Sequence, residues 1–330
     1  MSAAFAHPVT RGIVLAAAGV LVLAAAVIGL LTLTRRTPPA LTRELWLRTG
    51  SWAVLLPLMI GPVLLGRAWT IAAVTALGLL CLREYDRATG LFREPVMAAA
   101  AALGILAVNF AALDAWYLFF MALVPLTVAV LAVASIPLDR PEGYIQRTGL
   151  AIVGFMLFGS GLGHLSYLAN DANYRPLVLL LLLTVALNDV LAFTFGKLIG
   201  GPKLLPATSP NKTISGSVGA LVVTTALVAR VAAAVFPGTG MDRWPVLVGL
   251  GLLVAVAGQA GDLMLSSIKR DIGIKDMGAL IPGHGGLLDR FNSLLLVAPA
   301  AFHYVNYFTV GVGAGQPTRV LTHALVAGAP

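Results

Sequence analysis

The sequence contains a single cysteine, Cys81, and few charged side chains. One cysteine excludes an intramolecular disulfide and any metal site built from several thiolates, and we expect Cys81 to be a small apolar residue of a helix. Charged residues make up 11% of the 330 positions, whereas soluble domains carry about 25%. Hydrophobic residues make up 58%. This composition predicts a protein whose main solvent is the lipid bilayer.

Several catalytic motifs are also missing from the sequence. It has no Walker-type phosphate loop, no His-Glu-x-x-His zinc motif and no serine nucleophile elbow. The net charge is +8, but the basic residues lie in short loops between apolar runs and form no tract. That pattern excludes nucleic acid as an expected partner.

Long apolar runs account for most of the chain. We predict ten transmembrane spans: about 12–34, 51–66, 68–82, 96–113, 116–136, 148–168, 177–196, 216–236, 245–266 and 292–313. Backbone polar groups find no partner in lipid, so the spans must be helices and the fold an all-α polytopic transmembrane bundle. The first run is longer than the apolar part of a signal peptide and is followed by Arg35 and Arg36, so we expect a retained helix. The second and third runs are short, and either tilt or form one re-entrant unit.

Basic residues are distributed unevenly between alternate loops. If the N-terminus lies outside the cell, the inner loops hold sixteen of the 22 Lys and Arg residues and the outer segments hold five. The inner loops are then 35–50, 83–95, 137–147, 197–215 and 267–291. The positive-inside rule requires this asymmetry, which predicts periplasmic termini. It also places two Gly- and Pro-rich stretches, 196–216 and 273–286, on the cytoplasmic side.

Two acidic residues, Asp189 and Asp262, fall inside predicted spans. A carboxylate at membrane depth is costly unless it is paired or metal-bound, so both are candidate functional residues; a structural ion pair is the alternative. Asp262, Ser266 and Lys269 are spaced i, i+4 and i+7 and share one helical face, with Arg270 beside them. This face suits a metal ion at depth and phosphate groups above it.

The next loop combines Lys275 and Asp276 with paired glycines at 285–286. Paired glycines let backbone N–H groups approach a phosphate closely. Asp289 and Asn292 lie three residues apart at the start of the last predicted helix and can present two oxygens to one cation. Hard oxygen ligands favour Mg²⁺ over zinc.

A third polar cluster precedes a predicted helix and consists of Ser209, Asn211, Lys212 and Thr213. Hydroxyl, amide and ammonium groups beside a helix N-terminus suit an anion, although Ser, Thr and Asn are also ordinary helix caps. For His284, between glycines, we favour a phosphate contact or a structural hydrogen bond over proton transfer.

The C-terminal motif resembles the signature of phosphatidate cytidylyltransferases, also called CDP-diacylglycerol synthases. It consists of SSIKR at 266–270, KD at 275–276 and PGHGGLLDRFN at 282–292. Every fixed position matches except the last, where Asn292 replaces the family's aspartate. The segments NDVLAFTFGKLIG at 188–200 and SPNKTISG at 209–216 resemble the family's other cytoplasmic motif.

This resemblance is specific over about 185–313, whereas over about 50–180 only the hydropathy is similar. It implies four parts: an extra N-terminal helix with a basic loop (1–50), further membrane helices (51–176), a catalytic membrane domain (177–313) and a C-terminal tail (314–330). We expect the tail to be poorly ordered. The resemblance further implies the cytoplasmic (inner) membrane of a bacterium, a site facing the cytoplasm, and a homodimer.

The clusters and the resemblance together assign roles to individual residues. Catalytic roles fall to Asp262, Asp289, Lys269, Arg270, Lys275, Asp276 and Asp189. Substrate-binding roles fall to Ser209, Asn211, Lys212, Thr213, Ser266, His284, Gly285, Gly286 and Arg290. The resemblance implies Mg²⁺, with a second cation, near Asp262 and Asp289, with Asn292 in place of a third carboxylate.

The implied reaction joins CTP and phosphatidic acid, a membrane lipid, into CDP-diacylglycerol and pyrophosphate. A phosphatidate oxygen is already ionised, so the attack on the α-phosphate needs no strong base; positioning and charge neutralisation supply the catalysis. Three alternatives stay open. They are a cytidylyltransferase for another lipid phosphate, an inactive relative marked by Asn292, and a transporter that uses Asp189 and Asp262 as coupling sites.

Overall fold

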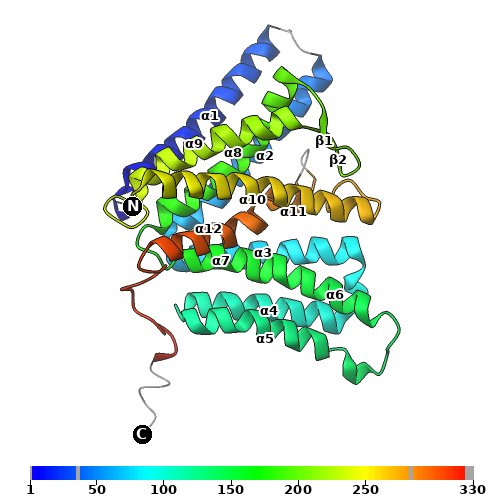
Figure 1. The fold of residues 1–330 in the computed structure, drawn as a ribbon. Helices are drawn as coiled ribbons and strands as arrows, with labels where there is room; N and C mark the ends of the chain where they lie inside the picture. Colours follow the sequence, from blue (N-terminus) through cyan, green and yellow to red (C-terminus); the bar gives the residue numbers. More distant parts are fainter. Residues whose placement is uncertain (1, 35–37, 282–284, 324–330) are drawn as a thin grey trace.

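The computed structural model describes residues 2–34, 38–281 and 285–323. Its helices pack side by side into a bundle, and the predicted all-α polytopic fold is confirmed (Figure 1). The helices are α1 (Pro8–Leu33), α2 (Pro39–Leu65), α3 (Arg67–Thr89), α4 (Pro95–Leu113), α5 (Tyr117–Val133), α6 (Tyr144–Gly154), α7 (Leu162–Leu168), α8 (Tyr174–Ile199), α9 (Ile214–Val235), α10 (Trp244–Asp271), α11 (Leu288–Phe291) and α12 (Leu294–Phe308). A π-helical segment, Phe155–Gly161, joins α6 to α7.

Within the described residues, nine helical segments are long and apolar enough to cross a membrane. The tenth predicted span, 292–313, is shorter than expected. Its helix α12 has 15 residues, or about 22 Å of length, because the regular helical hydrogen bonding is interrupted at Asn292 and Ser293, between α11 and α12. Both residues keep right-handed helical backbone angles, so the interruption, which lies inside the signature motif, is local.

The second and third spans are two separate helices rather than a re-entrant unit. α2 has 27 residues and α3 has 23, and they meet at Gly66, whose φ of 137° L side chains rarely adopt. Both extend beyond the predicted limits, because the added residues at one end of each helix include charged side chains that hydropathy excludes but a helix tolerates. Glu84 lies in one of these extensions.

Glycines allow the helices of the C-terminal half to approach closely. A Cβ on Gly216 of α9 would lie 2.3 Å from the Ala192 carbonyl oxygen of α8. A Cβ on Gly251 of α10 would lie 2.4 Å from the Thr225 carbonyl oxygen of α9. Small residues serve this purpose in membrane proteins, where packing rather than the hydrophobic effect joins helices. This packing fixes α8, α9 and α10 as one unit.

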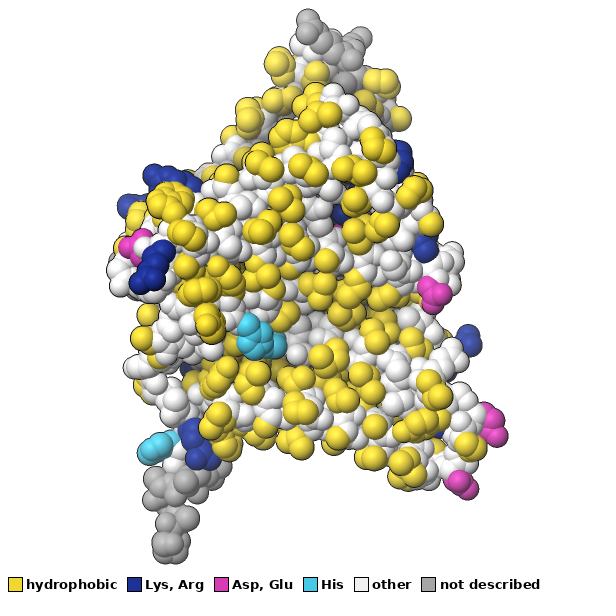
Figure 2. Space-filling view, viewed as in Figure 1, with side chains coloured by type: hydrophobic (Ala, Val, Ile, Leu, Met, Phe, Trp, Pro, Cys, Tyr) yellow, Lys and Arg dark blue, Asp and Glu magenta, His cyan; other side chains and the backbone are white. Residues whose placement is uncertain are grey.

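The motif-bearing loops gather at one end of the bundle. The hairpin of β1 (Lys203–Leu205) and β2 (Ser209–Thr213), the C-terminal end of α10 and α11 lie toward one side, and both chain ends lie toward the other (Figure 1). Charged side chains collect mainly at these two ends, and the surface between them is largely hydrophobic (Figure 2). This distribution matches a bilayer crossing, with the motifs all on one side.

The C-terminal tail is partly anchored rather than free. The Asp114 carboxylate at the end of α4 accepts hydrogen bonds from the backbone nitrogens of Leu321, at 2.6 Å, and Thr322, at 3.0 Å. The Thr322 hydroxyl donates to the same carboxylate at 2.6 Å. Arg319 lies over the Trp116 ring at 4.1 Å. The part of the tail up to residue 323 therefore packs against the end of the bundle opposite the motifs.

The predicted orientation can be tested by thiol labelling. In a Cys81→Ala background, Lys203→Cys and Lys275→Cys each place one cysteine at an exposed position, whereas Cys81 itself is fully buried. We expect a membrane-impermeant maleimide to label both only from the cytoplasmic side, because the basic loops stay inside. A cysteine at exposed Thr318 serves as the opposite-side control. Labelling of position 203 or 275 from the periplasm would overturn this orientation.

Candidate functional site

Two ion pairs connect the signature to the neighbouring elements. Lys212 of β2 pairs its Nζ with Asp262 Oδ2 of α10. Lys269, two turns further along α10, places its Nζ 2.8 Å from Asp289 Oδ1 of α11. The four side chains are 3–20% exposed. The structure thus brings together four predicted site residues, and each carboxylate has an ammonium partner.

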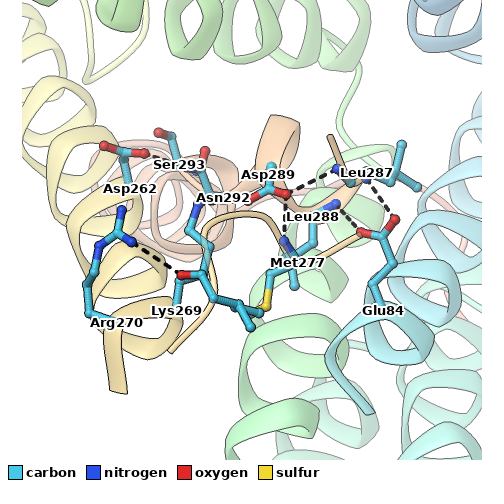
Figure 3. Close-up of polar contacts among 12 residues, drawn as sticks. Glu84, Asp262, Lys269, Arg270, Met277, Leu287, Leu288, Asp289, Asn292 and Ser293 are labelled. Atoms are coloured by element: carbon cyan, nitrogen blue, oxygen red, sulfur yellow. Dashed lines mark hydrogen bonds and ion pairs between the residues drawn. The ribbon is translucent and has the colours of Figure 1, made fainter. Parts of the chain in front are cut away.

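Asp289 is the most buried of these charges, with a side chain 3% exposed. Besides Lys269, it accepts hydrogen bonds at Oδ2 from the backbone nitrogens of Met277, at 2.9 Å, and Gly286, at 3.1 Å (Figure 3). Both donors belong to the loop that leads into α11. Each hydrogen bond to a charged group contributes about 1.5–3 kcal/mol, so Asp289 holds the loop closed around itself.

Asn292 contacts the carboxylate of the first ion pair. Its Nδ2 donates to Asp262 Oδ1 at 2.6 Å, and its Oδ1 accepts from the Ser293 backbone nitrogen at 2.7 Å. The amide nitrogen of Asn292 therefore orients the Asp262 carboxylate, and the amide oxygen accepts from the backbone N–H just before α12. Its predicted role as a metal ligand stays a prediction. An aspartate here would instead place a second carboxylate directly against Asp262.

Glu84 also contacts the signature segment, although the sequence motifs did not predict it. It lies near the end of α3, in the N-terminal half, and its carboxylate accepts from the backbone nitrogens of Leu287, at 2.9 Å, and Leu288, at 2.8 Å (Figure 3). These are N–H groups at the start of α11, where a carboxylate is favourable. A Cβ on Gly278 or Gly286 would lie 2.7 Å from a Glu84 oxygen. The only signal in the sequence was an acidic residue in a basic loop.

In this structure the paired glycines contact the protein itself, and their predicted role in phosphate binding stays a prediction. Gly285, with φ of 81°, accepts from the Ile281 backbone nitrogen at 2.9 Å. The Gly286 N–H donates to Asp289 rather than facing outward. The glycines are needed because the loop folds back tightly on Asp289 and Glu84. His284 lies outside the described residues.

The remaining predicted residues surround this centre in different ways. Thr213 is buried and caps α9 by accepting from the Gly216 backbone nitrogen at 3.1 Å. Arg270 donates to the carbonyl oxygens of Thr208, at 3.4 Å, and Ile274, at 3.3 Å, and so connects the hairpin to the signature loop. Ser209 and Ser266 are half-buried, and Asn211, Lys275 and Asp276 are exposed.

Asp189 and Arg290 lie at the membrane-facing edge of the site. Asp189 is on an exposed face of α8, within electrostatic reach of Asp262, Lys212 and Arg290. Arg290 is exposed on α11. Among the described residues, no ion pair joins Arg270, Lys275 or Arg290 to a carboxylate. These three cations are therefore free of ion pairs and available to an anion.

Two buried polar atoms lie unpaired below Asp262. Asn188 Nδ2 and Ser293 Oγ have no hydrogen-bond partner within the described chain. Both side chains lie against Gly258 of α10, one turn below Asp262: a Cβ there would lie 3.2 Å from Asn188 Nδ2 and 3.9 Å from Ser293 Cβ. A donor and an acceptor left open beside a carboxylate suit a bound water or a substrate oxygen.

A profile of the cytidylyltransferase family matches residues 46–308. The uncharacterised protein YnbB of Escherichia coli (strain K12) is 30% identical over 279 residues, covering 82% of this chain and 91% of that protein. A phosphatidate cytidylyltransferase of Staphylococcus aureus (strain COL) is 40% identical over 139 residues, 42% of this chain and 52% of that enzyme. The match to the Staphylococcus saprophyticus enzyme is 41% over 122 residues, 37% and 46% of the two chains.

The family match confirms the resemblance that the signature indicated and extends it. The chain spans about half the length of the phosphatidate cytidylyltransferases it matches. The family profile, however, begins at residue 46, after α1, and includes α3. The N-terminal half, where only hydropathy was similar at first sight, thus belongs to the same family match as the signature, and it supplies Glu84.

We expect Glu84→Gln to loosen the signature loop. Glutamine keeps one acceptor oxygen but turns an NH₂ group toward a backbone N–H, so the loop loses one charge-assisted hydrogen bond, about 1.5–3 kcal/mol. Amide hydrogen exchange at Leu287 and Leu288 should accelerate accordingly.

The matched control for this prediction is Glu94→Gln. Glu94 lies 3.6 Å from Arg140, whose side chain is 61% exposed, and such surface pairs contribute about 0–1 kcal/mol. Exchange at Leu287 and Leu288 should not change in this control. Equal exchange in both variants would show that Glu84 does not hold the loop.

Proposed function

This chain belongs to the cytidylyltransferase family, a family of nucleotidyltransferases, and from that premise we propose that it transfers the cytidylyl group of CTP to phosphatidic acid. The products are CDP-diacylglycerol and pyrophosphate. The proposal rests on two ion pairs, Lys212–Asp262 and Lys269–Asp289. They lie at the end of the membrane helices, beside cations that form no ion pair. Such a site serves two anionic substrates, one from water and one from lipid.

The cations of the site can neutralise the phosphates. Lys212 and Lys269 are already fixed by their carboxylate partners, so their ammonium groups need little reorganisation to contact a triphosphate. Arg270, Lys275 and Arg290 add three further charges. The attack brings two anions together, so charge neutralisation and positioning are the main requirements of this reaction.

The carboxylates fit a divalent cation by their chemistry. Asp262, which Asn292 contacts, and Asp289 supply hard oxygen donors, and hard oxygens suit Mg²⁺. Both are engaged by lysines in this structure, so an ion bound here would replace or share the ammonium contacts. When bound, such an ion would polarise the α-phosphate and stabilise the departing pyrophosphate. We propose Mg²⁺ at these residues, with room for a second cation.

The proposed reaction needs no proton acceptor. An ionised phosphatidate oxygen forms a bond to the α-phosphorus of CTP, and the bond from that phosphorus to the bridging oxygen of pyrophosphate breaks. Lys212 and Lys269 would hold the triphosphate, and Arg290 would hold the lipid phosphate. Among the described residues, no histidine forms an ion pair with a carboxylate, as this chemistry allows.

The location of the site supports access from two phases. The motif loops share one end of the bundle, which we propose faces the cytoplasm of a bacterial inner membrane, where CTP is found. Arg290 lies at the edge of the site that borders α2 and α8, so a lipid can reach it sideways. The suggested homodimer stays a prediction.

A related substrate is the second candidate. The matched phosphatidate cytidylyltransferases align with this chain over about half their length, whereas the relative matched over 91% of its length is uncharacterised. A different lipid phosphate could therefore accept the cytidylyl group. Purified protein incubated with labelled CTP, Mg²⁺ and either phosphatidic acid or another lipid phosphate distinguishes the two by the product formed.

We expect Asp262→Asn and Asp289→Asn to abolish turnover while leaving a folded membrane protein. Loss of either carboxylate removes a strong electrostatic contact, about 3 kcal/mol or at least about 100-fold in kcat/KM. Asp271→Asn, at the exposed end of α10, is the control and should keep the wild-type rate. Near-normal turnover in the first two variants would refute the assignment.

The Asn292→Asp variant tests the one departure from the signature. A second carboxylate against Asp262 repels it until a cation binds between them, so the variant should reach its half-maximal rate at a lower Mg²⁺ concentration than wild type. A magnesium titration of both proteins measures this. Identical curves would show that position 292 does not affect the metal. An inactive wild type rescued by Asn292→Asp would show an impaired enzyme.

A further inference from the structure

An apolar cavity lies directly beside the site. It has a volume of about 250 Å³ and is enclosed by α2, α3, α8 and the segment from α11 to α12. Leu55 and Met59 of α2, Val74 of α3 and Leu182 of α8 contribute to its wall. A smaller void of about 20 Å³ shares Leu55, Met59 and Leu182 with it and is also lined by Arg290. The cavity thus leads from the membrane interior toward a cation of the signature.

α11 separates this cavity from the polar site. Leu287 and Phe291, four residues apart, share one face and line the cavity. Asp289, between them in the sequence, faces Lys269 and the loop nitrogens instead (Figure 3). One short segment of the signature therefore presents an apolar wall on one side and the buried carboxylate on the other.

A third hollow continues the cavity toward the membrane surface. It has a volume of about 560 Å³ and is lined by Arg43, Trp46 and Leu55 of α2 together with Leu280 and Ile281 of the signature loop. Leu55 is common to all three. Tryptophan and arginine at a helix end are typical of the membrane interface, where lipid headgroups lie. Buried residues make up only 11% of the most apolar stretch of α2, so α2 is the wall of the cavity with the least protein packed against it.

We propose that this cavity binds one acyl chain of the lipid substrate, with the lipid phosphate at Arg290 and entry along α2. The proposal rests on the proposed function and adds to it the place of the lipid chain. Charge supports this occupant, because the void ends at Arg290, which forms no ion pair with a carboxylate in the described chain and has only Asp189 within electrostatic reach. Size supports a single chain, because a dry cavity of about 150 Å³ already holds a benzene molecule.

The cavity determines where the acyl chain lies more than how tightly the lipid binds to the protein. An acyl chain that leaves the bilayer for an apolar cavity exchanges one apolar environment for another, so burial itself gives little free energy. The gain comes from packing, which depends on the length and shape of the chain. Filling the cavity should therefore impair long-chain substrates and spare short-chain ones.

Two adjacent alanines of α3 give a matched test. Ala73 lines the cavity, whereas Ala72 is exposed on the outer face of the same helix. We expect Ala73→Phe to lower kcat/KM for dioleoyl phosphatidic acid by at least about tenfold, to change kcat/KM for dihexanoyl phosphatidic acid little, and to leave the KM for CTP unchanged. Ala72→Phe should behave as wild type with both lipids.

A second measurement does not depend on turnover. Phosphatidic acid with a diazirine at the end of one long acyl chain should, on illumination, label peptides of α2, α3 or α8 in wild type and in Ala72→Phe, and much less in Ala73→Phe. If this pattern appears but wild type forms no product from CTP, the cavity proposal holds and the proposed function fails. If wild type is active but the two variants label equally, or Ala73→Phe impairs both chain lengths equally, the cavity proposal is wrong.

Discussion

The burial of the Asp289 carboxylate is the constraint on which the site depends. Its side chain is 3% exposed, and an ionised group at that depth is costly unless several donors surround it. Three donors do so, and they come from different places: Lys269 from α10, Met277 from the loop and Gly286 from the turn before α11. The hydrogen bonds to this one carboxylate therefore hold the loop in place at Met277 and at Gly286.

Glu84 supports the same loop from the opposite side. It satisfies the first N–H groups of α11, which has four residues and no helical length to stabilise it. One of the N-terminal helices therefore holds the signature segment in place. This contact gives a physical reason for the family match to include both halves of the chain.

The two carboxylates of the site differ in their surroundings. Asp289 is enclosed by fixed backbone donors, whereas Asp262 is held by two side chains, Lys212 and Asn292, which can rearrange. Asp262 is therefore the carboxylate freer to exchange its partners when substrates bind. On the other side of α11, the signature presents apolar residues to a lipid-accessible cavity. A few residues of the signature thus separate the polar site from the apolar cavity.

Local patterns in the sequence were enough for the fold class and for the family, because hydropathy, charge and motif spacing are properties of neighbouring residues. They also singled out Asp262, Asp289, Lys212 and Lys269, which the structure joins in two ion pairs. Tertiary structure alone decided the rest. Glu84 lies 203 residues from its partner Leu287, and nothing local marks it. The N–H of Gly286 donates to Asp289, and the helical hydrogen bonding of the last span is interrupted at Asn292. These contacts form only when helices that are far apart in the sequence pack together.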